Sequence, residues 1–173
     1  MAQKTPESYL KFISKYPQPT HKIPEIGNIY VFAYLFNQTL NGKKSYQALK
    51  DEKEKKFCDF IPAVFVWRIF PNYSFNGFNL HSVPIPRRRE WLRTLQRYAG
   101  DEKVDAETRA KKMLPLKNLF KATDLESFSA RLVRKMKLIP VSQWSDLIEF
   151  DVNTTFRATS NEIMAKYLGL MGR

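Results

Sequence analysis

Five arginines between residues 87 and 97 are the side chains of this sequence with the clearest capacity for binding chemistry. They are Arg87, Arg88, Arg89, Arg93 and Arg97. The planar guanidinium group donates hydrogen bonds in pairs, which suits the phosphates of a nucleic acid and equally the carboxylates of a neighbouring protein. A solvated helix face is a third interpretation of the same cluster. All three interpretations stay open at this point.

The excess of positive charge extends beyond these arginines. Residues 85–137 contain fifteen Lys or Arg and seven Asp or Glu, a surplus of eight out of the net charge of +12 of the whole chain. Arg131, Arg134 and Lys135 belong to this stretch, and we expect them to contact the same kind of partner. A strongly basic chain attracts anionic partners such as nucleic acid, an acidic protein surface or a membrane surface.

Residues that support catalysis or metal binding in other proteins are sparse here. Cys58 is the only cysteine and has no histidine near it in the sequence to activate it, so we interpret it as a half-buried spectator. His21 and His81 belong to no metal-ligand motif, and no Gly-rich phosphate loop or nucleophile elbow is present. The carboxylates within 101–107 read as solvent-facing, although carboxylates distant in sequence can converge in a fold. We therefore predict a protein that is not an enzyme and that binds no metal and no cofactor.

Length and composition set broad limits on the class of protein. A chain of 173 residues with 43% apolar and 14% aromatic residues suits one globular domain. A lone cysteine permits no internal disulfide, which fits a reducing compartment. The N-terminal residues lack the apolar core of a signal peptide, and no run approaches the roughly 20 apolar residues that cross a bilayer. We therefore expect a soluble protein made or assembled inside a cell, without a membrane partner.

The first 28 residues have the pattern of an arm. Aromatic and aliphatic residues recur there at helical spacing, namely Tyr9, Phe12, Ile13 and Tyr16. Pro17 and Pro19 then end any helix. The apolar side chains of the arm pack either on the core of this chain or on the surface of a neighbour, and we favour the first alternative.

Residues 29–83 have the pattern of a sheet. The β-branched and aromatic runs 29–36 and 60–70 are of strand length, and 78–81 return as a short third strand. Both faces of 29–36 are apolar, so this strand is central or covered on both sides. The charged insertion at roughly 40–58 is typical of a solvated helix or a mobile segment.

Residues 84–173 have the pattern of helices. We expect a helix over 87–98 with arginines on its outer face, a charged helix over 104–113 and a last helix over 159–168. Thr123 and Glu126 form a capping-box pattern for a further helix. Its apolar stripe would consist of Leu125, Phe128, Leu132 and Met136, with Arg131, Arg134, Lys135 and Lys137 on its exposed side.

These elements predict an N-terminal arm (1–28) and a single α+β domain (29–173). The domain is mostly β over 29–83 and mostly α over 84–173. We expect a small bent antiparallel β-sheet or an SH3-like barrel, followed by a basic helical half.

Three blocks of the sequence carry a resemblance to a known family. The first is Ile26-Gly27-Asn28-Ile29-Tyr30-Val31-Phe32-Ala33-Tyr34. The second is the strand 61–66 followed by Gly77-Phe78-Asn79-Leu80-His81 and then by a proline-led, arginine-containing helix from Pro84. The third runs from Arg131-Leu132-Val133 to Ile139-Pro140-Val141-Ser142-Gln143-Trp144. In this order and spacing the blocks resemble a family of small virion-associated proteins of large, T4-like tailed bacteriophages.

The resemblance spans most of residues 26–150 and implies a place in a phage particle assembled in the cytoplasm of the bacterial host. Members are described as structural proteins or as protectors of DNA ends. The expected partners are other virion proteins in a symmetric multi-subunit assembly, and double-stranded DNA in the second role. In the assembly role the N-terminal arm and the C-terminal tail would dock on neighbouring subunits. This sequence departs from the family pattern in its insertion at 40–58 and in having Ser82-Val83 where the family has an aromatic residue and a leucine.

Overall fold

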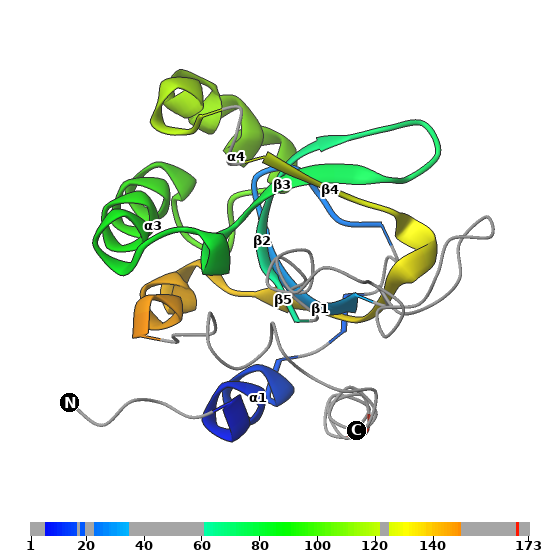
Figure 1. Ribbon diagram of the computed structural model, residues 1–173. Coiled ribbons are helices and arrows are strands. Elements are labelled where there is room, and N and C mark those ends of the chain that lie inside the picture. The colour runs from blue at the N-terminus through cyan, green and yellow to red at the C-terminus, as the bar shows by residue number, and fades with distance from the viewer. Residues whose placement is uncertain are drawn as a thin grey trace.

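A five-stranded antiparallel sheet with helical segments packed against it forms the centre of the molecule (Figure 1). The computed structural model describes residues 6–16, 18–19, 23–34, 61–121, 125–149 and 169. The strands are β1 (Ile29–Tyr34), β2 (Ala63–Ile69), β3 (Phe75–Asn79), β4 (Leu125–Phe128) and β5 (Val133–Ile139). Their order across the sheet is β4-β3-β2-β1-β5. The predicted α+β class is therefore confirmed.

Helical segments precede, separate and follow the strands along the described chain. The α-helices are α1 (Pro6–Ser14), α3 (Ile85–Ala99) and α4 (Ala106–Met113). The 3-10 helices are η2 (Leu80–Ser82), η3 (Leu114–Leu119), η5 (Ala130–Leu132) and η6 (Val141–Glu149). In Figure 1, α3, α4 and η6 lie on the same side of the sheet, so the sheet positions the helix that carries the five predicted arginines. The charged insertion at 40–58, Cys58, His21 and the expected last helix at 159–168 lie outside the described residues.

β1 is an interior strand of the sheet, as the apolar residues on both of its faces predict. All six of its residues are buried, and it pairs with β2 on one side and with β5 on the other. Two of its side chains bury a hydroxyl group, and each hydroxyl accepts a backbone N–H: Tyr30 from Glu25 at 3.0 Å and Tyr34 from Ser129 at 3.1 Å. Burial raises the pKa of both tyrosines. β1 therefore satisfies its polar atoms inside an apolar strand.

β2 and β3 form a hairpin whose close contact depends on Gly77. A Cβ atom at Gly77 would lie 2.3 Å from Val64 Cγ1 and 2.6 Å from the carbonyl oxygen of Phe65. Any side chain would push the two strands apart, so glycine is needed where β3 crosses β2. The hairpin leads directly into η2 and α3, and it fixes the point from which α3 starts.

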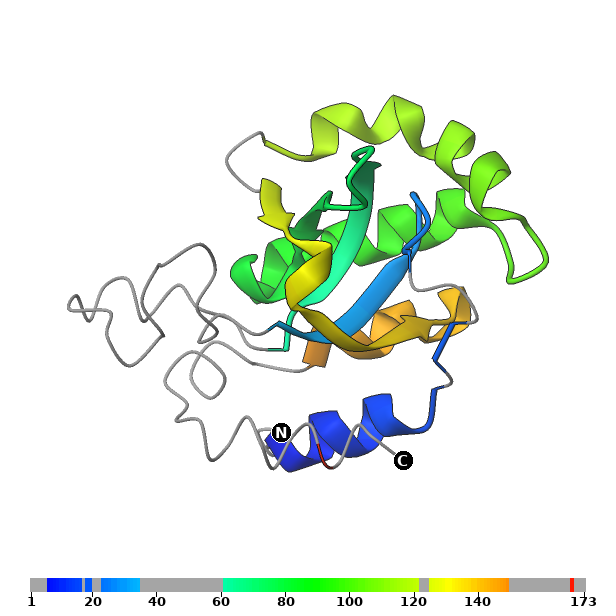
Figure 2. The same ribbon diagram turned by 90° about the vertical axis from the view of Figure 1, so that its right-hand side faces the viewer.

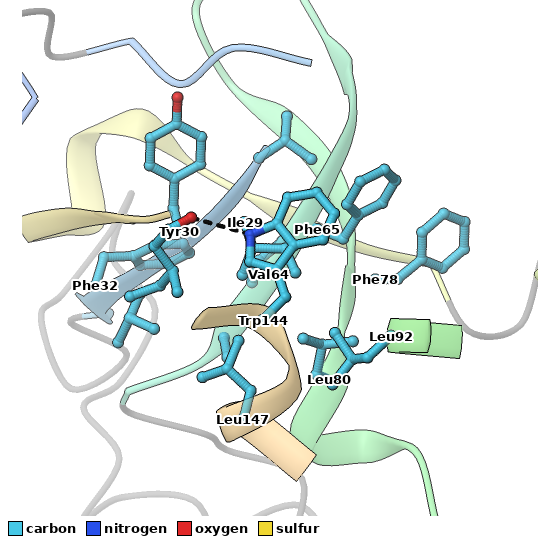
Figure 3. Packing of buried hydrophobic residues seen from close by; sticks show 14 of the residues in the cluster. Ile29, Tyr30, Phe32, Val64, Phe65, Phe78, Leu80, Leu92, Trp144 and Leu147 are labelled. Atoms are coloured by element: carbon cyan, nitrogen blue, oxygen red, sulfur yellow. Dashed lines mark hydrogen bonds between the residues drawn. The ribbon is translucent and has the colours of Figure 1, made fainter. Parts of the chain in front are cut away.

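Aromatic rings fill the space between the sheet and the helical segments (Figure 3). Phe78 and Phe120 stack with ring centroids 3.9 Å apart, and the Phe65 ring meets the Trp144 ring edge-on. Trp144 Nε1 donates a hydrogen bond to the carbonyl oxygen of Ile139 at 2.9 Å, which ties η6 to β5. Such aromatic pairs contribute about 0.5–1.5 kcal/mol each beyond their burial. This core holds the inner face of α3 in place.

The helix predicted after Thr123 is wrong. Residues 125–139 form β4, η5 and β5 instead, and β4 pairs with β3 while β5 pairs with β1. Glu126, the expected capping residue, accepts a hydrogen bond from Ser82 Oγ at 2.8 Å. The open edges of β3 and β1 need strand partners, and this long-range pairing outweighs a local helix signal. Phe128, Leu132 and Met136 are nevertheless buried, so the choice of core residues was right.

The sheet bends, but closure into a barrel is not seen. β4 and β5 are the two ends of the strand order, and they do not pair with each other within the described residues. The SH3-like barrel therefore stays a prediction.

The arm packs on the protein's own core, as we favoured. Tyr9, Ile13 and Tyr16 are buried, the Tyr9 ring meets the His81 ring at 5.3 Å, and Tyr16 Oη donates to Gln143 Oε1 at 3.2 Å. Figure 2 shows α1 below β5 and η6. These side chains are therefore committed to their own chain and do not dock on a neighbour.

Candidate functional site

α3 presents the predicted arginines on a rigid helix. Pro84 precedes the helix and Pro86 lies in its first turn, where the missing N–H of proline costs nothing. One face packs on the core through Trp91, Leu92 and Leu95. The opposite face is polar and faces solvent. The orientation of α3 is therefore set by the apolar residues and not by its arginines.

The outer face of α3 carries a row of three exposed arginines. Arg89, Arg93 and Arg97 follow one another at i, i+4 and i+8. An α-helix rises 1.5 Å per residue, so successive members lie about 6 Å apart along the axis. Within the described part of the chain, their side chains make no hydrogen bond and no ion pair. We name these three residues the outer arginines.

Arg87 lies at the side of the same helix. Its guanidinium group lies over the ring of Trp91, with its central carbon 4.6 Å from the ring centroid. This cation–π contact restrains the side chain while Arg87 stays partly exposed. Arg87 can therefore add a fourth, restrained cation beside the outer arginines.

Arg88 does not belong to the contact surface, contrary to the prediction. Its exposed fraction is 0%, and its Nη2 donates to the carbonyl oxygen of Val83 at 3.1 Å. Arg88 lies on the core-facing side of α3, because it shares the i, i+4, i+7 spacing of one helix face with Leu92 and Leu95. Arg88 thus stabilises the chain entering α3 and is not available to a partner.

Arg131, Arg134 and Lys135 lie apart from α3. Arg131 belongs to η5, and Arg134 and Lys135 belong to β5; in Figure 1, η5 lies across the sheet from α3. Arg131 and Arg134 are exposed, and Lys135 is partly exposed. The basic residues that the sequence placed in one helical half therefore form two separate groups.

Two further basic residues, Arg109 and Lys137, are buried although the sequence does not mark them as interior. Arg109 donates to the carbonyl oxygens of Ala99, Asp101 and Val104 at 2.9–3.2 Å, and also to Asn28 Oδ1. Burial lowers the pKa of Arg109, and the negative charge of Glu102 opposes that shift. Since α4 looks uniformly charged in the sequence, no local signal marks Arg109 as interior.

Lys137 is the second buried cation, and the prediction that it lies on the exposed side of a helix is wrong. It lies on β5 opposite Val31, and only 4% of it is exposed. Burial lowers its pKa, and the positive charge of Lys135 lowers it further. Lys137 and Arg109 reduce the number of cations that the basic composition leaves for partners.

The carboxylates of residues 101–107 are exposed, as predicted, and serve local structure. Asp105 caps α4 by accepting hydrogen bonds from Thr108 N at 2.8 Å and Thr108 Oγ1 at 2.7 Å, which lower its pKa. Glu102 accepts from Ser142 N at 2.8 Å, and hydrogen bonds from Ser142 lower its pKa. Across the described ranges, no three His, Cys, Asp or Glu side chains group so as to hold a metal ion.

Comparison of the chain with protein-family models, with curated protein sequences and with solved structures found no match in any of the three. Among the helices of the described residues, none is both long enough and apolar enough to cross a lipid bilayer.

Proposed function

We propose that this protein is a non-enzymatic assembly component of a tailed-phage virion, in the tail, baseplate or neck. The outer face of α3 docks on an acidic surface of a neighbouring subunit. One observation carries the proposal: Arg89, Arg93 and Arg97 form a row of exposed cations on a packed helix, without partners in the described part of their own chain. The phage context comes from the sequence resemblance.

The chemistry of the row supports a specific contact over a merely solvated face. Because the core fixes α3, the three arginines project from one face of the helix, and the helix backbone loses little freedom on binding. Guanidinium forks match carboxylates in pairs, and several such contacts at one interface fix the register of the partner. Docking through α3 also agrees with the burial of Tyr9, Ile13 and Tyr16, which packs these side chains of the arm on the protein's own core.

A second candidate is a DNA-binding protein that covers the ends of the packaged genome. The same row favours it, because guanidinium groups about 6 Å apart on one helix face can contact successive phosphates. Each phosphate contact releases counterions, so this function requires an affinity that falls steeply with salt.

A titration against linear and circular duplex DNA at about 50 mM and about 200 mM salt separates the two functions. The test variant is Arg89→Ala/Arg93→Ala/Arg97→Ala. The matched control is Lys103→Ala/Lys112→Ala/Lys117→Ala, which removes the same charge from other exposed positions. If DNA is the partner, linear duplex is preferred, and only the test variant lowers the salt slope, by about 2.7 for three lost contacts.

If a protein is the partner, DNA binding is weak and both variants change it equally. The test variant is then missing from particles when it replaces the wild-type protein during phage assembly, while the control variant is incorporated. Normal incorporation of the test variant, together with weak DNA binding, would overturn both functions.

A further inference from the structure

Two residues of the second basic group, Arg134 and Lys135, line a cavity beside η5 and β5. The cavity has a volume of about 360 Å³, which is within the range of small-ligand sites. Its apolar lining includes Phe75 from β3 and Val133 and Met136 from β5. Its polar lining includes Arg134 and Lys135, and Gln18, Pro19 and Pro24 complete the described wall.

The charge of this lining has one sign. Arg134 and Lys135 both face the cavity, and none of its described lining residues is acidic. Within the part of the chain that the structure describes, neither cation makes an ion pair. Two like charges around an apolar floor produce a positive potential that an anion relieves.

Arg134 is held in position for such a role. Its Nη1 donates to the carbonyl oxygens of Arg131 at 2.7 Å and Val133 at 2.9 Å. These bonds use one nitrogen of the guanidinium group, so Nε and Nη2 keep donors for an anion. A side chain fixed before binding loses less conformational entropy when the ligand arrives.

Lys135 has an unusual backbone at the same place. Its φ of 53° lies in the left-handed region that residues other than glycine and asparagine seldom adopt. The pairing of β1 with β5 shifts register between Val31 and Ala33, so this part of β5 bulges. The bulge places two consecutive basic residues, Arg134 and Lys135, on the cavity.

From this geometry we propose that the cavity binds an organic anion, namely a phosphate or carboxylate carried on an apolar group. Arg134 and Lys135 bind the charged end, and Phe75, Val133 and Met136 contact the apolar end. A bidentate guanidinium contact suits both phosphate and carboxylate oxygens. This site is separate from the outer arginines, and it does not depend on the function proposed for α3.

Titration calorimetry of the full chain with phenyl phosphate tests the site. We expect saturable binding at one site per chain, at least tenfold tighter than inorganic phosphate, which lacks the apolar group, and phenol, which lacks the charge. Arg134→Met should weaken phenyl phosphate at least tenfold. Lys135→Asn removes the second charge and keeps a residue that tolerates positive φ, so it tests the site even if Arg134→Met alters η5.

The matched control is Arg89→Ala/Arg93→Ala/Arg97→Ala, which should bind phenyl phosphate as the wild type does. Phenylacetate, the anion of phenylacetic acid, and a peptide ending in Asp-Phe then distinguish a small-molecule anion from an acidic chain end of a protein. Equal binding by the wild type and by both cavity variants would overturn the proposal, as would equal affinity for phenyl phosphate and inorganic phosphate.

Discussion

Arg88 and Arg89 are neighbours on α3, yet Arg88 lies in the protein interior and Arg89 lies on the surface. Arg88, like Arg109 at the junction of α3, α4 and β1, is buried and donates to backbone carbonyl oxygens. Arg89 belongs to the outer arginines, which have no such partners in the described chain. A buried charge must be compensated within the fold, whereas an exposed one is left to meet another molecule. Location, and not residue type, therefore divides the arginines into structural and binding groups.

Arg109→Met should produce the largest loss of stability. The change keeps the aliphatic stem but leaves three backbone carbonyl oxygens and Asn28 without their donor. We expect a loss of about 3 kcal/mol in the free energy of unfolding, measured by urea denaturation. Lys112→Met, an exposed change on the same helix, is the control and should cost less than about 0.5 kcal/mol. Equal losses of stability in the two variants would contradict the distinction between buried, structural cations and exposed ones.

Arg88→Met should cost about 2 kcal/mol, because the carbonyl oxygen of Val83 loses a buried donor. Arg89→Met is the paired experiment one residue further along the helix. Its expected effect is within about 0.5 kcal/mol, because Arg89 is exposed. Thermal unfolding of the two variants side by side measures the difference. A stable Arg88→Met protein would show that Arg88 is dispensable to the core.

Lys137→Met should act in the opposite direction. Burial lowers the pKa of Lys137, so below its folded pKa the protonated lysine makes the fold less stable. Between the folded pKa of Lys137 and the unfolded value of 10.5, the unfolded chain binds this proton more strongly than the folded chain does. The free energy of unfolding of the wild type therefore rises as the pH rises through this range. We expect Lys137→Met to gain up to about 1 kcal/mol at pH 7 and to lose this alkaline rise. Urea midpoints measured across that pH range test both, and a variant less stable than wild type at pH 7 contradicts the prediction.

The smallest effect on stability is expected for the triple change of the outer arginines. Removing Arg89, Arg93 and Arg97 takes away no intramolecular hydrogen bond in the described chain, so the free energy of unfolding should change by less than about 0.5 kcal/mol. Urea denaturation checks this value. A loss above about 1.5 kcal/mol would assign the outer arginines a structural role, and any binding defect would then need another explanation.

Most elements with a strong local pattern were predictable. The alternating apolar runs became β1 and β2, and the apolar stripe with a proline start became α3. The secondary structure of residues 123–137 could not be predicted, because their apolar residues have helical spacing. In the structure a strand, the 3-10 turn η5 and a second strand bury Phe128, Leu132 and Met136 at that same spacing. Periodicity reports which residues are buried, and it cannot report that two strand edges elsewhere need partners.

For the candidate site, the sequence by itself determined that α3 carries exposed arginines at i, i+4 intervals, since helical geometry alone puts Arg89, Arg93 and Arg97 opposite an apolar stripe. Only the tertiary structure decided that Arg88 and Arg109 are interior and that Arg134 and Lys135 face a cavity beside η5 and β5. The physical reason is that burial of a cation depends on carbonyl oxygens supplied by distant segments. The composition gives the number of charges, but only the packed structure shows which of them are buried and which are exposed.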